Sequence, residues 1–138
     1  MGAGIVSVNN RDPHTYSVSG TLGLPSGATN YLPPFFVPVQ QGQYVALTSL
    51  RAIIHGGTSA TLNIQHGVWN GTSGITWTTI TGLSGIVVYQ YTTPAACLYT
   101  PTNPEVFADG DLLAVVVAGL TASPDGLTVT FNLDQAIV

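Results

Sequence analysis

The stretch LLAVVVAGLTASPDGLTVTFNL, residues 112–133, decides the fold. In its C-terminal part apolar side chains alternate with polar ones, as a strand with one buried face requires: Leu127, Val129, Phe131 and Leu133. Residues 112–118 are apolar on both faces, which is typical of a central strand or of one whose outer face another subunit covers. Between them, Ser-Pro-Asp-Gly at 123–126 favours a tight turn. We therefore predict that the two strands pair as a hairpin.

A second hairpin is predicted upstream by the same kind of pattern. YVALTSLRAIIH, residues 44–55, places alternate apolar residues on one face: Leu50, Ala52 and Ile54. The glycine-rich HGGTS at 55–59 turns the chain. TLNIQHGV at 61–68 follows, with Leu62, Ile64 and His66 in phase. Because His66 shares the apolar face, we expect it to lie in the core or at an interface.

Short strand patterns continue along the rest of the chain, each bounded by Gly, Pro, Asn or Ser. They cover residues 4–8, 15–20, 35–39, 74–80 and 85–91. No window of about twelve residues carries a helical period with caps. About eight or nine short strands favour an all-β fold, an antiparallel β-sandwich of the jelly-roll type. We divide the chain into an extended arm or first strands (1–34) and a β-sandwich domain (35–138).

Charge is scarce in this chain, and its scarcity excludes several classes of function. Only 6% of the 138 residues are charged, against about 25% in a typical soluble domain. The net charge is −4, and Arg11 and Arg51 are the only fixed positive charges, so nucleic-acid binding is not expected. No apolar run approaches the length of a spanning helix and no secretory signal is visible, so we expect a soluble, unexported protein without membrane contact. Cys97 is the only cysteine, which excludes an intramolecular disulfide.

The densest group of acids is Asp109-Gly110-Asp111. A calcium loop of the EF-hand kind would need further acids at alternate positions, and here the chain runs directly into apolar residues. We predict a tight turn instead, in which Gly110 takes a backbone conformation that other residues avoid and the aspartates cap backbone N–H groups. The three histidines show no metal-ligand spacing, and no pair of titratable groups suggests catalysis. We predict no catalytic residue, no metal site and no cofactor.

A surface with so little charge indicates burial between subunits. Interface cores are depleted of charge and enriched in aromatic side chains, and large exposed apolar patches mark interfaces. We expect a homo-oligomer. In YLPPFF, residues 31–36, two prolines hold the backbone extended and present the aromatic side chains at low entropic cost. The expected interface residues are Tyr31, Phe35, Phe36, Arg11 and Asp12.

Three segments together resemble a known family: PPFFVPVQQGQ (33–43), LRAIIHGGTSATLNIQ (50–65) and ADGDLLAVVVAGLTASPDGLTVTFNL (108–133). They are similar to a small β-sandwich module of virion surface proteins of tailed bacteriophages, which occurs in fibres, tail appendages and head decoration proteins. The resemblance covers roughly residues 33–134. It implies a virion structural protein, and the module brings no catalytic residues.

Within that family, the short chain favours a stand-alone head decoration (cement) protein over one domain of a long fibre. The resemblance then implies a homotrimer that binds the major capsid protein on the outer surface of the head, assembled in the host cytoplasm. The alternative is a tail fibre or receptor-binding module that recognises host-surface glycan. For that function, aromatic rings would stack on sugars. The candidates are Trp69, Trp77, Tyr89, Tyr91 and Tyr99.

Overall fold

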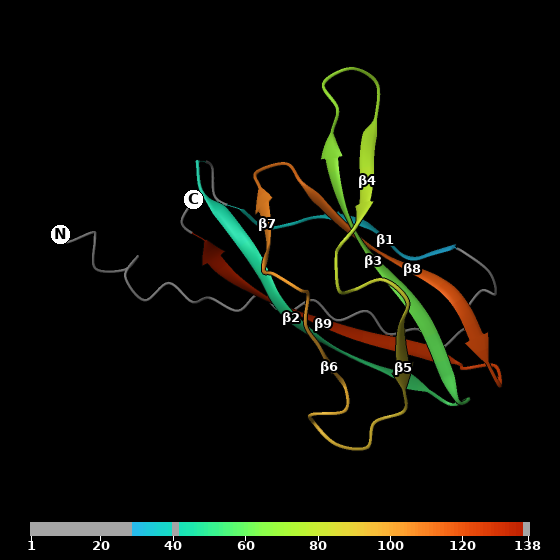
Figure 1. Cartoon of the computed structure of the whole chain (residues 1–138). Coiled ribbons are helices and arrows are strands. Elements are labelled where there is room, and N and C mark those ends of the chain that lie inside the picture. The colour runs from blue at the N-terminus through green and yellow to red at the C-terminus, as the bar shows by residue number, and fades with distance from the viewer. Residues whose placement is uncertain (1–28, 40–41, 137–138) are drawn as a thin grey trace.

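The computed structural model describes residues 29–39 and 42–136, with the backbone alone for residues 29–33. Its regular structure is entirely β, in agreement with the predicted class and strand number (Figure 1). The described strands are β1 (Thr29–Phe36), β2 (Tyr44–His55), β3 (Ser59–Trp69), β4 (Ile75–Thr79), β5 (Ile86–Tyr89), β6 (Leu98–Tyr99), β7 (Glu105–Ala108), β8 (Leu112–Thr121) and β9 (Gly126–Ala136). In these residues no helix is long and apolar enough to cross a membrane.

The strands form two antiparallel sheets, which pack face to face as a β-sandwich. In the first sheet the order is β1, β8, β3, and both β4 and β5 pair with the outer edge of β3, at its two ends. In the second sheet β2 pairs with β9 along one edge and with β6 and β7 along the other. Each sheet therefore has one edge formed by a single strand and an opposite edge formed by two short strands placed end to end.

Alternate side chains of the long strands fill the space between the sheets. The largest buried ones are Leu47, Leu50, Ile54, Leu62, Ile64, Leu113, Leu127, Phe131 and Leu133, and Phe107 of the short strand β7 joins them. The predicted inward faces of residues 44–55 and 127–133 are confirmed, because every apolar residue named for them is buried. The predicted central position of residues 112–118 is also confirmed, since β8 lies between β1 and β3.

The two predicted hairpins, 44–55 with 61–68 and 112–118 with 127–133, are wrong. β2 pairs with β9 and β3 pairs with β8, so each of the two turns carries the chain from one sheet to the other. Such a crossing turns the strand out of its own sheet, which explains the consecutive left-handed residues in both turns: Gly56, Gly57, Ala122 and Ser123. The side-chain alternation of a strand reports which face is buried and is the same for a hairpin and for a crossing.

The two crossing turns lie against each other and close one end of the sandwich. The Thr58 N–H donates to the Thr121 carbonyl at 3.0 Å, and the Asp125 N–H donates to the His55 carbonyl at 2.7 Å. The paired strands β2 with β9 and β3 with β8 thus form one ribbon that folds over at the two turns. The expected boundary between residues 34 and 35 falls within β1, and the strands expected at 4–8 and 15–20 lie outside the described residues.

Candidate interaction surface and charged cluster

The hairpin of β3 and β4 projects beyond the rest of the sandwich (Figure 1). Its strands pair from Gln65 with Thr79 to Trp69 with Ile75. Its loop is held by one side chain, because the Asn70 Oδ1 accepts hydrogen bonds from three backbone N–H groups at 2.9, 3.1 and 3.3 Å: those of Thr72, Ser73 and Gly74. The loop satisfies these donors itself, so the hairpin is a preformed projection.

One row of paired residues crosses the first sheet at the base of this hairpin. Phe36 pairs with Leu112, Leu112 with Gly67, and Gly67 with Trp77. Directly paired residues share a face of a sheet. The next residue of β8, Leu113, is fully buried in the core, so the row lies on the outer face of the sheet. We name Phe36, Leu112, Gly67 and Trp77 the apolar row.

The apolar row continues along the hairpin. A Cβ added at Gly67 would lie 2.6 Å from Cζ3 of Trp77 and 2.9 Å from Cγ2 of Ile75, so the missing side chain lets the indole cover the strand. Trp69 and Ile75 lie two residues further on and share the same face. Phe36 is 69% exposed, Trp69 57% and Ile75 38%, which makes this side of the molecule an exposed apolar surface.

The predicted interface residues occupy different environments. Phe36 is exposed, whereas Phe35 is half-buried and its ring lies 6.0 Å from the ring of Phe131 in the core. For Tyr31 the structure describes only the backbone, within β1. Arg11 and Asp12 lie outside the described residues. The alternation of the strand thus separates the two phenylalanines, with one ring in the core and one on the surface.

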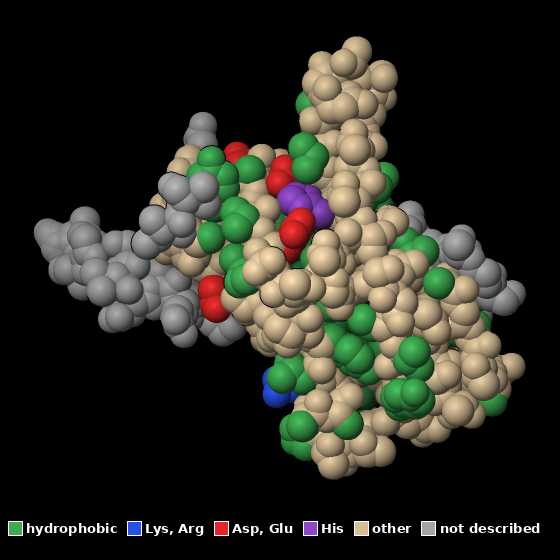
Figure 2. Space-filling view, in the orientation of Figure 1, with side chains coloured by type: hydrophobic (Ala, Val, Ile, Leu, Met, Phe, Trp, Pro, Cys, Tyr) green, Lys and Arg blue, Asp and Glu red, His purple; other side chains and the backbone are tan. Residues whose placement is uncertain are grey.

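A charged cluster lies at the base of the projecting hairpin (Figure 2). His66 of β3 faces Glu105 of β7 with Nδ1 to Oε2 at 2.7 Å, and it faces Asp111 with Nε2 to Oδ2 at 2.8 Å. The imidazole also packs on Phe107, with ring centroids 4.1 Å apart. Since β3 and β7 belong to different sheets, the cluster joins the two sheets at this end of the sandwich.

The geometry of the cluster suits a structural contact. Each ring nitrogen of His66 lies within hydrogen-bonding distance of a carboxylate oxygen, so both polar atoms of the imidazole are engaged inside the protein. The two ring nitrogens point in different directions and cannot converge on one ion. Asp111 Oδ2 accepts a further hydrogen bond from the Ala108 N–H at 3.0 Å. Throughout the described part of the chain, no group of three or more His, Cys, Asp or Glu residues is placed to hold a metal ion.

Sequence reasoning found part of this cluster and missed its assembly. The predicted turn is confirmed: Gly110 has a φ of 93°, and Asp111 caps the Ala108 N–H. The contact between Asp111 and His66 was not foreseen, because it depends on the pairing of β3 with β8, which places His66 opposite Leu113. The sequence does indicate that His66 faces the core or an interface, because it alternates in phase with apolar residues of its strand. Nothing in the sequence indicates a contact for Glu105.

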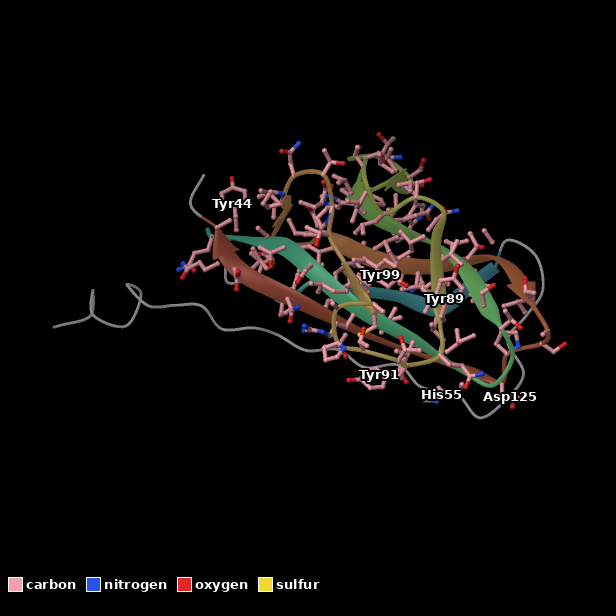
Figure 3. All side chains as sticks on the ribbon, turned by 60° about the horizontal axis from the view of Figure 1, so that its bottom comes forward. Tyr44, His55, Tyr89, Tyr91, Tyr99 and Asp125 are labelled. Carbon is pink, nitrogen blue, oxygen red and sulfur yellow. The ribbon has the colours of Figure 1, made fainter. Side chains whose placement is uncertain are left out.

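The exposed tyrosines Tyr89 and Tyr91 lie at the opposite end of β3 (Figure 3), beside a cavity. The cavity, of about 330 Å³, is lined by Tyr89, Gln90, Thr92, Ala96 and Cys97. Tyr89 and Tyr91 are 54% and 57% exposed. Hydrophobic side chains gather over β5, β6 and the segment between them (Figure 2). This end therefore presents a second apolar surface. We name the cavity in it the tyrosine cavity.

Tyr99 joins the sheets near the tyrosine cavity, and its ionisation should affect stability. Its hydroxyl donates to the Val87 carbonyl at 2.7 Å, which links β6 of one sheet to β5 of the other. Burial, with smaller contributions from Cys97 and Tyr89, raises the pKa of Tyr99 above the ordinary tyrosine value of 10.0.

A group whose pKa is raised in the folded state stabilises the protein below its unfolded pKa and loses this contribution as the pH rises further. We therefore expect the free energy of unfolding to fall as the pH passes 10.0 and rises towards the folded pKa of Tyr99. Tyr99→Phe should reduce this alkaline loss. The measurement is urea unfolding between pH 8 and about 11, with Tyr91→Phe as the exposed control. Equal alkaline losses in wild type and Tyr99→Phe would contradict the assignment.

No protein-family model, curated protein or solved structure matches the chain.

Proposed function

We propose that the protein is a non-catalytic virion structural protein of a tailed bacteriophage, a head decoration protein that binds the major capsid protein on the outer surface of the head. The observation that carries this proposal is the exposure of Phe36. This large apolar side chain is 69% exposed at the end of a proline-stiffened strand, while its neighbour Phe35 anchors that strand to the core. An aromatic ring presented by a rigid strand is a favourable anchor for a protein partner.

The surface around Phe36 supports binding to protein. It continues through the apolar row into Trp69 and Ile75 of the hairpin, and no Asp, Glu, Lys or Arg occurs between Arg51 and Glu105. The exposed side chains of this surface, Phe36, Trp69 and Ile75, are uncharged, which matches the composition of interface cores. The β-sandwich class agrees with the module that the sequence resembles. The occupied ring nitrogens of His66 favour a structural role for the only histidine–carboxylate cluster of the described residues.

The mechanism we propose is thermodynamic. A protein that binds the mature capsid lattice, and not its precursor, stabilises that lattice by linkage. The homotrimer implied by the resemblance would present three identical surfaces to neighbouring capsid subunits, and multivalency would raise the overall affinity without new kinds of contact.

A second candidate is a receptor-binding module for host-surface glycan. Tyr89 and Tyr91 favour it, because both rings are exposed; Tyr89 lines the cavity of about 330 Å³, and Tyr91 lines a second one of about 190 Å³ that shares Cys97 with it. Tyrosine rings offer an apolar face for stacking and a hydroxyl for hydrogen bonds to a sugar. The two candidates use different ends of the molecule and can be separated by mutation.

The decisive substitution for the first candidate is Phe36→Ser. We expect it to weaken binding to heads that lack the protein by at least about tenfold, because it removes the central aromatic contact, while the circular dichroism spectrum stays unchanged. The measurement is co-sedimentation of purified protein with such heads. Val106→Ser is the matched control, since Val106 is 40% exposed on β7 and lies outside the apolar row.

Unchanged binding of Phe36→Ser would contradict the proposed surface. Labelled protein found at the tail tip and absent from the head would contradict the decoration role. Retention on a glycan array, lost in Tyr89→Ala and kept in Phe36→Ser, would favour the second candidate.

A further inference from the structure

Two neutral apolar surfaces lie at opposite ends of strand β3. At one end Trp69 pairs with Ile75 in the projecting hairpin, and at the other end Ser59 pairs with Tyr89 beside the tyrosine cavity. The rise of a strand separates these two ends by roughly 30 Å. A side chain at the tip of the hairpin therefore cannot reach the cavity of its own chain.

Trp69 has the properties of an inserting side chain. It is 57% exposed on a hairpin that projects from the sandwich and whose loop is held by Asn70. Trp77 differs, because its ring lies over Gly67 at the base of the hairpin. A tryptophan presented on a preformed projection gains by burial in a partner and loses little conformational entropy.

The tyrosine cavity suits an aromatic side chain better than a polar ligand. Its volume of about 330 Å³ is sufficient for an indole, and its wall residues are uncharged. Two of its polar groups are already engaged: the Gln90 Nε2 donates to the Gly57 carbonyl at 2.7 Å, and the Cys97 thiol donates to the Pro94 carbonyl at 3.3 Å. These bonds fix the wall and leave fewer groups to recognise a hydrogen-bonding ligand.

Charge also permits the two surfaces to meet. Both belong to the segment between Arg51 and Glu105, which contains no Asp, Glu, Lys or Arg. The side chains that would meet, Trp69 and the residues that line the cavity, are themselves uncharged, so their contact buries no ionised side chain of its own.

We propose that Trp69 of one copy inserts into the tyrosine cavity of a second copy of this chain. The contact joins two different patches and is heterologous, so repeated contacts close into a ring or continue as a filament. This self-association goes beyond the proposed capsid role and does not depend on it. It would withdraw Trp69 from the surface around Phe36, but it leaves Phe36 itself free to contact another protein.

Complementary variants test this contact. Trp69→Ser removes the inserted side chain and keeps the cavity, whereas Ala96→Phe fills the cavity and keeps Trp69; both positions are exposed. Each variant alone should associate at least about tenfold more weakly than wild type. Labelled Trp69→Ser titrated with Ala96→Phe should bind at least about tenfold more tightly than with unlabelled Trp69→Ser, because only the mixed pair retains one intact contact. The measurements are sedimentation velocity for each variant and fluorescence anisotropy for the pairs.

The matched control is Val68→Ser. Val68 is adjacent to Trp69 and 43% exposed, but it faces the other side of the hairpin, so this variant should associate like wild type. Equal loss in Val68→Ser would overturn the specific role of Trp69. Wild type that sediments as a monomer up to about millimolar concentration, or a mixed pair no tighter than the like pair, would overturn the proposal. Loss of head binding in Phe36→Ser with unchanged self-association would support the capsid role independently.

Discussion

Gly57→Ala is expected to lower the free energy of unfolding by about 3 kcal/mol, whereas Gly85→Ala should lower it by about 1 kcal/mol. Both glycines have left-handed backbones, with φ of 65° and 63°, so the conformational strain of an added Cβ is nearly the same. Their surroundings differ. A Cβ at Gly57 would lie 2.6 Å from the Pro124 nitrogen and 2.9 Å from the Ala122 carbonyl oxygen, while a Cβ at Gly85 would meet nothing within 4 Å.

The difference between the two variants isolates the steric contact between the crossing turns. The atoms that a Cβ at Gly57 would meet belong to the backbone of the β8–β9 turn, so relief of the clash requires the turns to move apart. That movement would disturb the hydrogen bond from the Thr58 N–H to the Thr121 carbonyl. Urea unfolding of both variants measures the difference, and equal losses would mean that the turns yield without cost.

This contact also shows what the sequence alone could not provide. The sequence predicts a change of chain direction at residues 55–59 and at 123–126, and the chain does change direction there, between β2 and β3 and between β8 and β9. Each was expected to fold a strand back onto its own neighbour, whereas the structure packs the two turns on each other between the sheets. Turn-forming residues report that the chain changes direction, and the plane of that change is set by contacts between segments more than 60 residues apart.

The buried faces of the strands were predictable because alternation is a local property. Leu50, Ala52 and Ile54 share one face by spacing alone, and all three are at most 2% exposed. Strand partners were not predictable, because they depend on long-range register. The apolar row has the same origin: Phe36, Gly67 and Leu112 come from three distant segments, and only the register of β1, β8 and β3 places them side by side.

The charged cluster also depends on the register of the strands, and its contribution to the free energy of unfolding can be measured. His66→Leu is expected to lower the free energy of unfolding by about 2 kcal/mol. Removal of one partner from a fully buried pair costs about 3–5 kcal/mol. Here the side chains of Glu105 and Asp111 are 31% and 13% exposed, and water offsets part of the loss. His55→Leu is the control, because the exposed imidazole of His55 contacts only a threonine hydroxyl among the described side-chain hydrogen bonds, at 2.9 Å, and its loss should change stability by less than about 0.5 kcal/mol.

A triple variant distinguishes electrostatics from packing at the cluster. In His66→Leu the carboxylates of Glu105 and Asp111 lose their shared partner and remain close to an apolar side chain, so neutralising both should restore part of the stability. We expect His66→Leu/Glu105→Gln/Asp111→Asn to unfold at a higher urea concentration than His66→Leu. If the triple variant is no more stable, the loss comes from packing on Phe107, whose ring lies 4.1 Å from the imidazole. Amide hydrogen exchange adds a local readout, because the cluster fixes the base of the β3–β4 hairpin to β7. His66→Leu should lower protection in β4, whose Thr78 pairs with His66, more than in β9, which pairs with β2.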